Sequence, residues 1–477
     1  MLIVTFLIII TVNKSLSLKQ EVKLTSMAMA QKEQTEDVYD VILFFGQSNM
    51  SGSMSIGIDT RYQLNNNATV ESYSAKTGID EDIINQSWVS NYTVTDVEPN
   101  TVYEYHAADN SLYDLSDLEY NGYTANGADI TVNKINGELL YYDYTAYKFY
   151  TRWSTDRPSW IKENSYSLSN AYGTNMVNEF AKEYYERTGH KVVCVNAALG
   201  GQSLDHFAPN VIYKDAYGTN ICLYAAMSNK YLAALRYLEN NNLKIGNKFF
   251  VMFQGENEAG ANSTSIISEY KSNFQKIKAQ LYQDLGINKG AIILTGFYPG
   301  LYNGTSYAQG VKAVNQAQTE LINENSDVIL GSDFPYKHYV PGEADYNNTS
   351  LYNYKANMNG VDYNTALQNA KLVVGGEYDD NLFHFTSAAL AQIGRETAIN
   401  MCNSMSTNIS TLEQNSYTYD GTAKMPEVII QDGNTTLTNG VDYTVSYANN
   451  INEGTAKAII TGKGVYTGSE EITFEIE

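Results

Sequence analysis

Short apolar runs alternate with longer amphipathic stretches through most of this chain, and that alternation most constrains its fold. The runs with the length and composition of buried strands lie at 39–45, 191–197, 248–253, 290–297 and 327–330. Stretches with apolar residues at helical spacing lie at 168–187, 222–238, 265–285, 312–325 and 387–401. Thr386 precedes the last stretch as an expected N-cap. Such alternation predicts βαβ units, and therefore an α/β fold with a parallel sheet covered by helices on both faces.

Two regions depart from this pattern. Residues 53–165 are weakly periodic and rich in Tyr, Asn, Asp and Gly, which favours long loops over one end of the sheet. From Tyr417 onward, period-two alternation with regular turn signals is typical of an all-β sandwich. This segment resembles the small Ig-like repeat of bacterial surface and secreted proteins. We expect the α/β domain at 38–403 and an Ig-like domain, without His or Cys, at 411–477.

The N-terminus indicates secretion. Residues 2–12 form an apolar run too short to span a bilayer as a helix, and small and polar residues follow it. We expect a signal peptide at 1–17 and a linker at 18–37, and hence a secreted or cell-surface protein. The run lacks a basic segment before it, so translation from Met27 is the alternative.

Charge and cysteine content exclude several classes of partner and site. A net charge of −22 argues against nucleic acid or an anionic membrane surface as partner. The three cysteines do not form a disulfide framework, and Cys194 and Cys222 have the surroundings of small core residues. No Cys/His cluster has zinc-binding spacing, so no metal site is predicted. Forty Tyr suit stacking on sugar rings, although AT-rich codon usage explains them equally well.

Residue types for acyl transfer follow the ends of the predicted strands. Ser48 lies on a turn after the first strand, at Gly46-Gln-Ser-Asn-Met50, where a nucleophile would be exposed. Gly200 and Gly201 follow the second strand, and their N–H groups suit a developing oxyanion. Gln254-Gly-Glu256 follows the third strand. Because parallel strands end at one edge of a sheet, these blocks should converge there.

A histidine with carboxylates just upstream completes the set. His384 precedes the last predicted helix, in Asp379-Asp-Asn-Leu-Phe-His384. These four blocks, in this order, resemble the sialate O-acetylesterase group of carbohydrate esterases, which includes acetylxylan and sialate esterases of the SGNH hydrolases. The likeness covers about residues 38–403. It implies a three-layer α/β/α, flavodoxin-like fold with a parallel sheet, and a serine esterase that hydrolyses O-acetyl groups of carbohydrates.

The resemblance also implies a role for each matching residue. Ser48 matches the nucleophile and His384 the general base that later protonates the leaving sugar hydroxyl. The N–H groups of Ser48 and of Gly200 or Gly201, with the side chain of Gln254, match the oxyanion hole. The residues expected to support these groups are Asn49, Glu256 and Asn381. No metal or organic cofactor is implied.

The chain departs from the family pattern at the triad acid. The family usually places Asp three residues before the histidine, where this chain has Asn381, with Asp380 one position earlier. Asp380 reaches the imidazole through a longer turn, a backbone carbonyl orients the ring in a Ser–His dyad, or the enzyme is impaired. Loss of a triad acid costs about four orders of magnitude in turnover.

Two other functions are weighed against the esterase. One is a non-catalytic glycan-binding or adhesive surface protein on a decayed hydrolase scaffold, in which the C-terminal domain contacts the cell surface or a glycan. The other is a lipid or thioester hydrolase of the same fold. Within the esterase hypothesis, the acetylated glycan stays open among xylan, sialic acid and pectin.

Overall fold

The computed structural model describes most of the chain. The described residues are 37–52, 66–90, 97–107, 110–116, 139–143, 148–151, 168–169, 175–214, 220–260, 265–296, 305–348, 354–357, 359–374, 384–404, 409–432, 435–462 and 469–477. The predicted signal peptide at 1–17 lies outside them, as does the predicted linker apart from residue 37.

A seven-stranded sheet organises the α/β part, in the order β12-β11-β10-β1-β7-β2-β3. Its strands are β1 (Val38–Gly46), β2 (Val102–His106), β3 (Ser111–Asp114), β7 (Lys191–Asn196), β10 (Lys244–Phe253), β11 (Lys289–Ile293) and β12 (Val328–Leu330). β1 pairs with β7, β7 with β2, β10 with β11 and β11 with β12 in parallel, whereas β3 pairs with β2 in the antiparallel direction. Without the β2–β3 hairpin, the remaining strands have the 2-1-3-4-5 order of flavodoxin-like folds. The expected fold class is confirmed.

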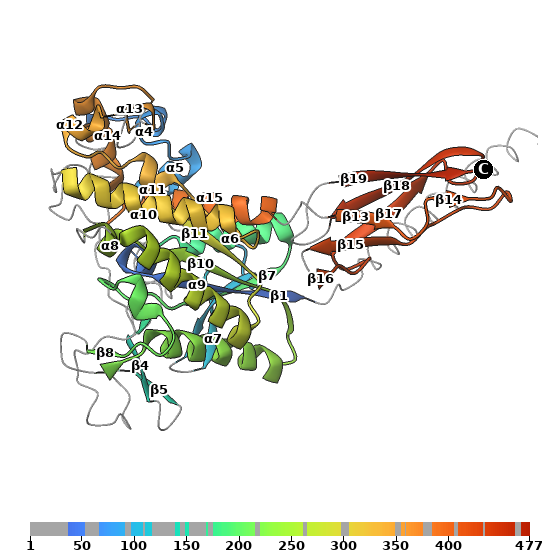
Figure 1. The fold of residues 1–477 in the computed structure, drawn as a ribbon, viewed down its shortest axis with the longest axis horizontal. Coiled ribbons are helices and arrows are strands. Elements are labelled where there is room, and N and C mark those ends of the chain that lie inside the picture. The colour runs from blue at the N-terminus through green and yellow to red at the C-terminus, as the bar shows by residue number, and fades with distance from the viewer. Residues whose placement is uncertain are drawn as a thin grey trace, which may run out of the picture. The chain divides into compact units, whose positions relative to one another are not determined.

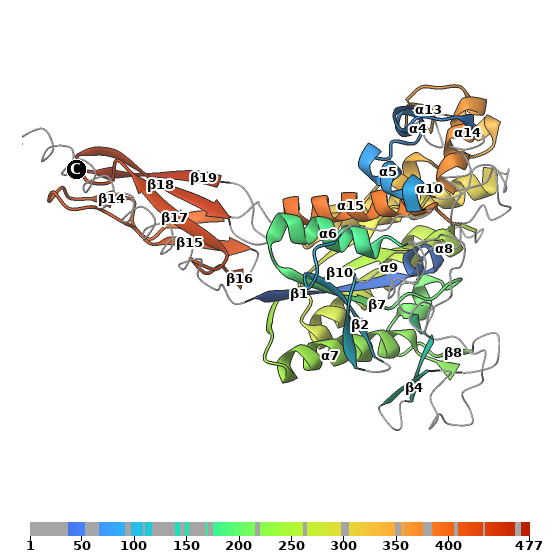
Figure 2. The ribbon, with the colours of Figure 1, turned by 180° about the vertical axis from the view of Figure 1, so that it is seen from behind.

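The strand β1 shows why helices cover both faces. Successive side chains of a strand point to opposite faces, and here both sets are buried. Ile42 and Phe44 join the core beneath α6 (Val177–Thr188) and α15 (Ser387–Ser404). Val41, Leu43 and Phe45 join the core beneath α7 (Leu223–Asn240), α9 (Ile266–Leu285) and α10 (Thr305–Glu324). Figures 1 and 2 show α6 and α15 on one side of the strands and α7 on the other.

Residues 53–165 hold more regular structure than the sequence indicated. The prediction of long loops there is wrong for α4 (Val70–Thr77), α5 (Glu81–Ser90) and the β2–β3 hairpin. The helix predicted from residue 168 begins at Val177, and Leu168–Ser169 forms strand β6. β6 joins β4 (Leu139–Asp143) and β5 (Lys148–Thr151) in a separate three-stranded sheet.

Several short elements surround the ends of the main strands. They are α2 (Ser48–Ser51), the 3-10 helix η1 (Leu204–Phe207), β8 (Tyr213–Lys214), β9 (Asn220–Ile221), α8 (Glu256–Gly260), α11 (Phe334–Lys337), α12 (Glu343–Tyr346), α13 (Tyr354–Asn357) and α14 (Tyr363–Val374).

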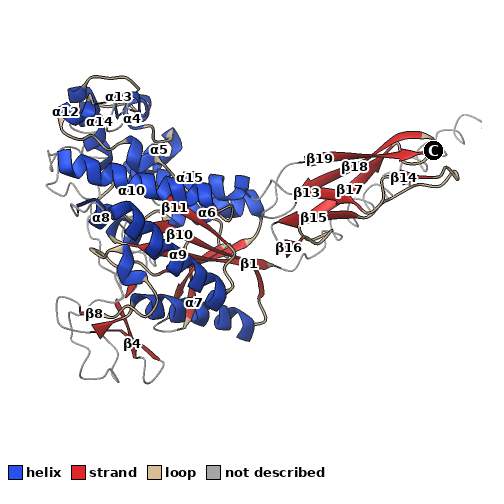
Figure 3. Ribbon diagram, viewed as in Figure 1, coloured by secondary structure: helices blue, strands red, loops and turns tan. Residues whose placement is uncertain are grey.

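In the described residues of the C-terminal part, 409–432, 435–462 and 469–477, the regular structure consists of strands, as Figure 3 shows by colour. One sheet has the order β13-β15-β16 and another the order β14-β19-β18-β17. The strands are β13 (Ile409–Leu412), β14 (Ser416–Tyr417), β15 (Val428–Asp432), β16 (Thr435–Thr436), β17 (Tyr443–Ala448), β18 (Gly454–Gly462) and β19 (Ser469–Ile476). The expected all-β composition is present, and the Ig-like identification and the domain boundaries stay predictions.

Two further expectations can be compared with the structure. Cys194, Cys222 and Cys402 are buried free thiols, in agreement with the expected absence of a disulfide framework. Among the described residues, no helix has the length and apolar character needed to cross a membrane.

Candidate active site

The candidate site lies where the ends of β1, β7 and β10 meet. The N–H of Gln47, just past β1, donates to the carbonyl of Phe253 at the end of β10, over 3.3 Å. The carbonyl of Gly46 accepts from the N–H of Leu199, past β7, over 2.9 Å. In the 2-1-3-4-5 order the gap between β1 and β10 is the switch point, at which the strand order reverses. Ligands of such folds bind at this position as a rule.

Glycine at position 46 permits this close approach. Its φ is +149°, and a Cβ there would lie 2.0 Å from the carbonyl oxygen of Phe253. A side chain would therefore force β1 and β10 apart.

Ser48 and Gly200 come together at this point. Ser48 opens the four-residue helix α2 and is partly exposed, whereas Asn49, Met50 and Ser51 are buried. A Cβ built on Gly200 would lie 3.7 Å from the Cβ of Ser48, so the glycine backbone faces the serine. Gly201, next in the chain, has φ +71°, which favours glycine. The expected convergence of Ser48 with the glycine loop is therefore present.

Asn196 anchors the glycine loop to α2, a role that the sequence reasoning missed. Its Nδ2 donates to the carbonyl of Met50 over 3.2 Å, and its Oδ1 accepts from the N–H of Ala198 over 3.0 Å. The Nζ of buried Lys230 donates to its carbonyl over 2.7 Å. The only signal for this residue was its position at the end of a predicted strand.

Gln254 is buried beside the glycine loop. Its carbonyl accepts hydrogen bonds of 2.8 Å each from the side chains of Tyr270, Thr295 and Gln318. Its Nε2 donates to the carbonyl of Gln202 over 2.8 Å and to Oε2 of Glu258 over 3.1 Å. Its Oε1 is buried and accepts no hydrogen bond from the residues that the structure describes. The side chain is thus held against the loop that contains Gly200 and Gly201.

Glu256 connects the blocks rather than facing solvent. Its carboxylate accepts hydrogen bonds from Nε2 of Gln47 and, over 3.0 Å, from Nδ2 of Asn49. Burial raises the pKa of Glu256, and the bonds from Asn49 and Gln47 oppose that rise. The supporting role expected for Asn49 and Glu256 stays a prediction.

The residue that follows His384 contacts the site. The N–H of Phe385 donates to Oδ1 of Asn49 over 3.2 Å, and the N–H of Thr386 donates to the carbonyl of Val373 over 2.7 Å. Thr386 caps α15 as predicted, accepting from the N–H of Ala389 over 3.3 Å. Burial lowers the pKa of His384, which favours the neutral imidazole that a general base requires.

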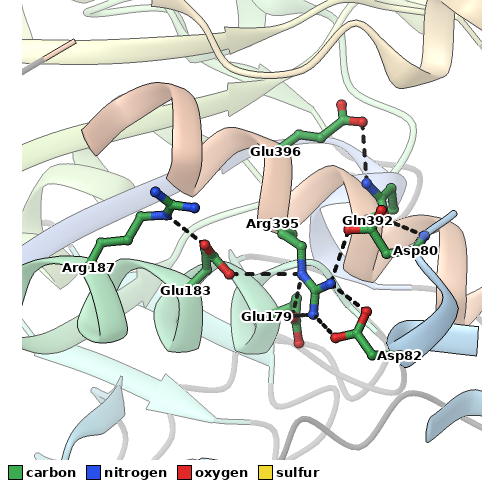
Figure 4. A network of polar contacts seen from close by, with 8 residues as sticks. All are labelled: Asp80, Asp82, Glu179, Glu183, Arg187, Gln392, Arg395 and Glu396. Carbon is green, nitrogen blue, oxygen red and sulfur yellow. Dashed lines mark hydrogen bonds and ion pairs between the residues drawn. The ribbon is translucent and has the colours of Figure 1, made fainter. Parts of the chain in front are cut away.

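Helix α15, which starts just after His384, is fixed by the network in Figure 4. Arg395 on α15 donates to Glu179 on α6 and to Asp80 and Asp82 at the start of α5, over 2.6 to 3.0 Å. Gln392, one turn earlier, accepts from the N–H of Asp80 over 2.9 Å. These contacts hold α15, the helix that follows His384, against α5 and α6.

The acid of the predicted triad is not placed. Asp380 and Asn381 lie outside the described residues, so the identity of the group that orients His384 stays a prediction. Glu258 was not singled out from the sequence, although its spacing of four from Gln254 was a usable signal. Among the described residues, no group of His, Cys, Asp and Glu has the arrangement needed to hold a metal ion.

The middle of the chain is similar to a known family. Residues 145–339 match the family model described as carbohydrate esterase, sialic acid-specific acetylesterase. The match includes the glycine loop, Gln254, Glu256 and Glu258, and it begins after Ser48 and stops before His384. No curated protein matches the chain.

Three solved structures are distantly similar to the chain. A protein from Arabidopsis thaliana is 14% identical with a TM-score of 0.37, covering 76% of this chain and 96% of that one. NanS is 12% identical with a TM-score of 0.36, covering 76% and 95%. XAC1771, a carbohydrate acetylesterase from Xanthomonas citri, is 11% identical with a TM-score of 0.33, covering 91% and 72%.

The functional class therefore rests on the family match, which implies an acetylated carbohydrate as substrate. It agrees with the resemblance inferred from the ordered sequence blocks: residues 145–339 of this chain are similar to the sialic acid-specific acetylesterases among the carbohydrate esterases.

Proposed function

We propose that the chain removes acetyl groups from carbohydrate hydroxyls through an acetyl-enzyme on Ser48. The observation that carries this proposal is the approach of the Gly200 backbone to the Ser48 side chain at the strand-end switch point. A nucleophile needs oxyanion donors beside it, and backbone N–H groups of a glycine loop meet that need without steric interference.

The reaction has two halves. Ser48 Oγ attacks the acetyl carbonyl carbon while His384 takes its proton, and the Ser48 amide, Gly200 and Gln254 stabilise the oxyanion. His384 then protonates the sugar oxygen, and the C–O bond to the sugar breaks. In the second half, water attacks the acetyl-enzyme, His384 takes the proton of that water and returns it to Ser48, and acetate leaves. Every step is an acid–base or acyl transfer by the chain's own residues.

The decisive test is acetate release by wild type and by S48A, on 4-nitrophenyl acetate and on an acetylated oligosaccharide. We expect S48A to lose on the order of 10⁴-fold to 10⁶-fold in kcat. S51A is the matched control, because Ser51 lies in the same short helix and is buried. S51A should keep most of the activity. Equal rates for wild type and S48A would contradict the esterase mechanism and favour a non-catalytic glycan-binding protein.

The orientation of His384 is tested by two further variants. If Asp380 holds the imidazole, D380A loses about 10⁴-fold in kcat while N381A loses little. If a backbone carbonyl orients the ring, D380A keeps most of its activity. If the enzyme is impaired by the missing acid, N381D raises kcat above the wild-type value.

We propose that the substrate is an acetylated polysaccharide or an O-acetylated sialic acid. Acetate release from acetylated xylan, acetylated pectin and O-acetylated sialic acid, each measured with S48A as background, distinguishes the three. A preference of at least about tenfold for one of them would name the natural substrate class.

We also propose that the protein is secreted or attached to the cell surface, on the strength of the apolar run at 2–12. Mass determination of the mature N-terminus tests it. Cleavage near residue 17 supports secretion, and an intact chain that starts at Met27 contradicts it.

A further inference from the structure

Glu258 is a carboxylate of the site that the mechanism above leaves unused. It lies in α8, four residues after Gln254. One of its oxygens accepts from Nε2 of Gln254 over 3.1 Å, and the other accepts from the N–H of Leu204, at the start of η1. A single carboxylate therefore bridges Gln254 and the segment that follows the glycine loop.

The hydrogen bonds of Gln254 show why this contact matters. An amide nitrogen carries two hydrogens, and both are already used, one by the carbonyl of Gln202 over 2.8 Å and one by Glu258 over 3.1 Å. A substrate oxyanion can receive a hydrogen bond from Gln254 only if one of these bonds is given up. The bond to Glu258 is the longer, and its acceptor is the one whose charge can change.

We propose that Glu258 is a positioning residue that controls oxyanion stabilisation by Gln254, its neutral form releasing the amide hydrogen and its charged form retaining it. This inference rests on the proposed function, in which Gln254 is an oxyanion donor. The charged form of Glu258 opposes stabilisation of the oxyanion for a second reason. A carboxylate beside the donor repels the negative charge that develops on the substrate oxygen.

The surroundings of Glu258 favour its neutral form near neutral pH. Burial raises the pKa of Glu258 to about 7, against the bond from Leu204, and the charges of Glu256 and Asp205 add to the rise. From α9, Tyr270 faces the same group, and its own pKa is raised well above the usual value, so it contributes no charge. From α10, the uncharged Gly310 packs against Ala259 of α8, and the uncharged Val314 packs against Gly255 just before α8.

The consequence is a pH profile with two limbs. Activity rises with pH as His384 loses its proton, on the acid side, because the base must be neutral. Activity then falls as pH rises through about 7, because Glu258 becomes charged and retains the Gln254 amide. A variant with a neutral side chain of the same shape should lack only the second limb.

The experiment measures kcat and KM for 4-nitrophenyl acetate from about pH 5 to about pH 9, corrected for uncatalysed hydrolysis. We expect E258Q to keep the acid limb, lose the alkaline fall, and exceed wild type in kcat by about tenfold at the alkaline end. E269Q, at an exposed carboxylate on α9, is the control and should keep both limbs.

Variants of Gln254 test the role of Glu258 even if E258Q folds poorly. Q254A should lose the alkaline limb and about 10²-fold to 10³-fold in kcat, and Q254A/E258Q should equal Q254A. An alkaline limb that persists in E258Q or in Q254A overturns the inference, as does a uniform loss in E258Q at every pH, which would indicate a merely structural role. S48A separates the two proposals: an active S48A contradicts the esterase mechanism, whereas an inactive S48A with an unchanged E258Q profile contradicts the role of Glu258 alone.

Discussion

The Oδ1 atom of Asn49 accepts a hydrogen bond of 3.2 Å from the N–H of Phe385. The residue after the proposed nucleophile is thereby joined to the residue after the proposed base, across a sequence separation of 336 positions. The Nδ2 atom of the same side chain donates to Glu256 over 3.0 Å. One amide therefore connects three of the four sequence blocks that indicated the function.

That connection predicts a specific defect in N49A. Without the amide, the segment that carries His384 loses its bond to α2, and the imidazole shifts relative to Ser48. Misplacement by about 1 Å costs about 10²-fold in rate, so we expect kcat to fall by about that factor with little change in KM. N325A is the control, because Asn325 is also buried but caps the end of α10. A wild-type kcat for N49A would show that Asn49 does not position His384.

The sequence predicted the centre of the sheet well and its margin poorly. The runs that became β1, β7 and β10 are apolar on both faces, and only a central strand of an α/β sheet is buried on both faces. In β2, by contrast, Glu104 and His106 interrupt the apolar pattern, and both are buried against each other with a contact of 3.3 Å. No local signal distinguishes that buried polar pair from an exposed loop.

The candidate site likewise contains residues that could be placed from the sequence and contacts that could not. Ser48, Gly200 and Gln254 could be placed at one edge because each follows a strand, and parallel strands end together. Which side chains bridge them could not be predicted, since Asn196 contacts Met50 across 146 positions and Asn49 contacts Glu256 across 207. Such pairings depend on loop geometry that only the folded chain supplies.

The close approach at Gly46 predicts a strict requirement for glycine. In G46A the new Cβ would meet the carbonyl of Phe253 at 2.0 Å, and φ would stay at +149°. We expect a loss of more than about 4 kcal/mol in unfolding free energy, or no folded protein, by thermal or urea unfolding. G189A is the control, because Gly189 has φ +70° with no atom within 4 Å of the added Cβ. It should cost about 1 to 2 kcal/mol, and equal losses in the two variants would contradict the steric explanation.

The network of Figure 4 predicts that Arg395 matters more for stability than its neighbour Arg187. The side chain of Arg395 is 12% exposed and that of its partner Glu179 1%, whereas Arg187 is 38% exposed and pairs with Glu183 on the same helix. R395M removes a cation from a buried carboxylate, which costs about 3 to 5 kcal/mol. R187M should cost less than about 1 kcal/mol. Comparable shifts in melting temperature for R395M and R187M would mean that the network does not stabilise the packing of α15.

The raised pKa of Glu258 also predicts how stability depends on pH. The unfolded carboxyl loses its proton near its usual pKa of 4.5, whereas the folded one retains it to about 7. Between these values the folded state binds more protons, so the stability of wild type falls as pH rises. E258Q does not titrate. Its stability relative to wild type should therefore increase from about pH 4 to about pH 8, by at most about 3 kcal/mol.

Urea unfolding of both proteins at the two pH values measures this difference, with E269Q as the control that should follow wild type. A constant difference between E258Q and wild type would show that Glu258 titrates alike in the folded and unfolded chains. Its burial beside Gln254 would then not hold it neutral, and the alkaline limb of the activity profile would need another group.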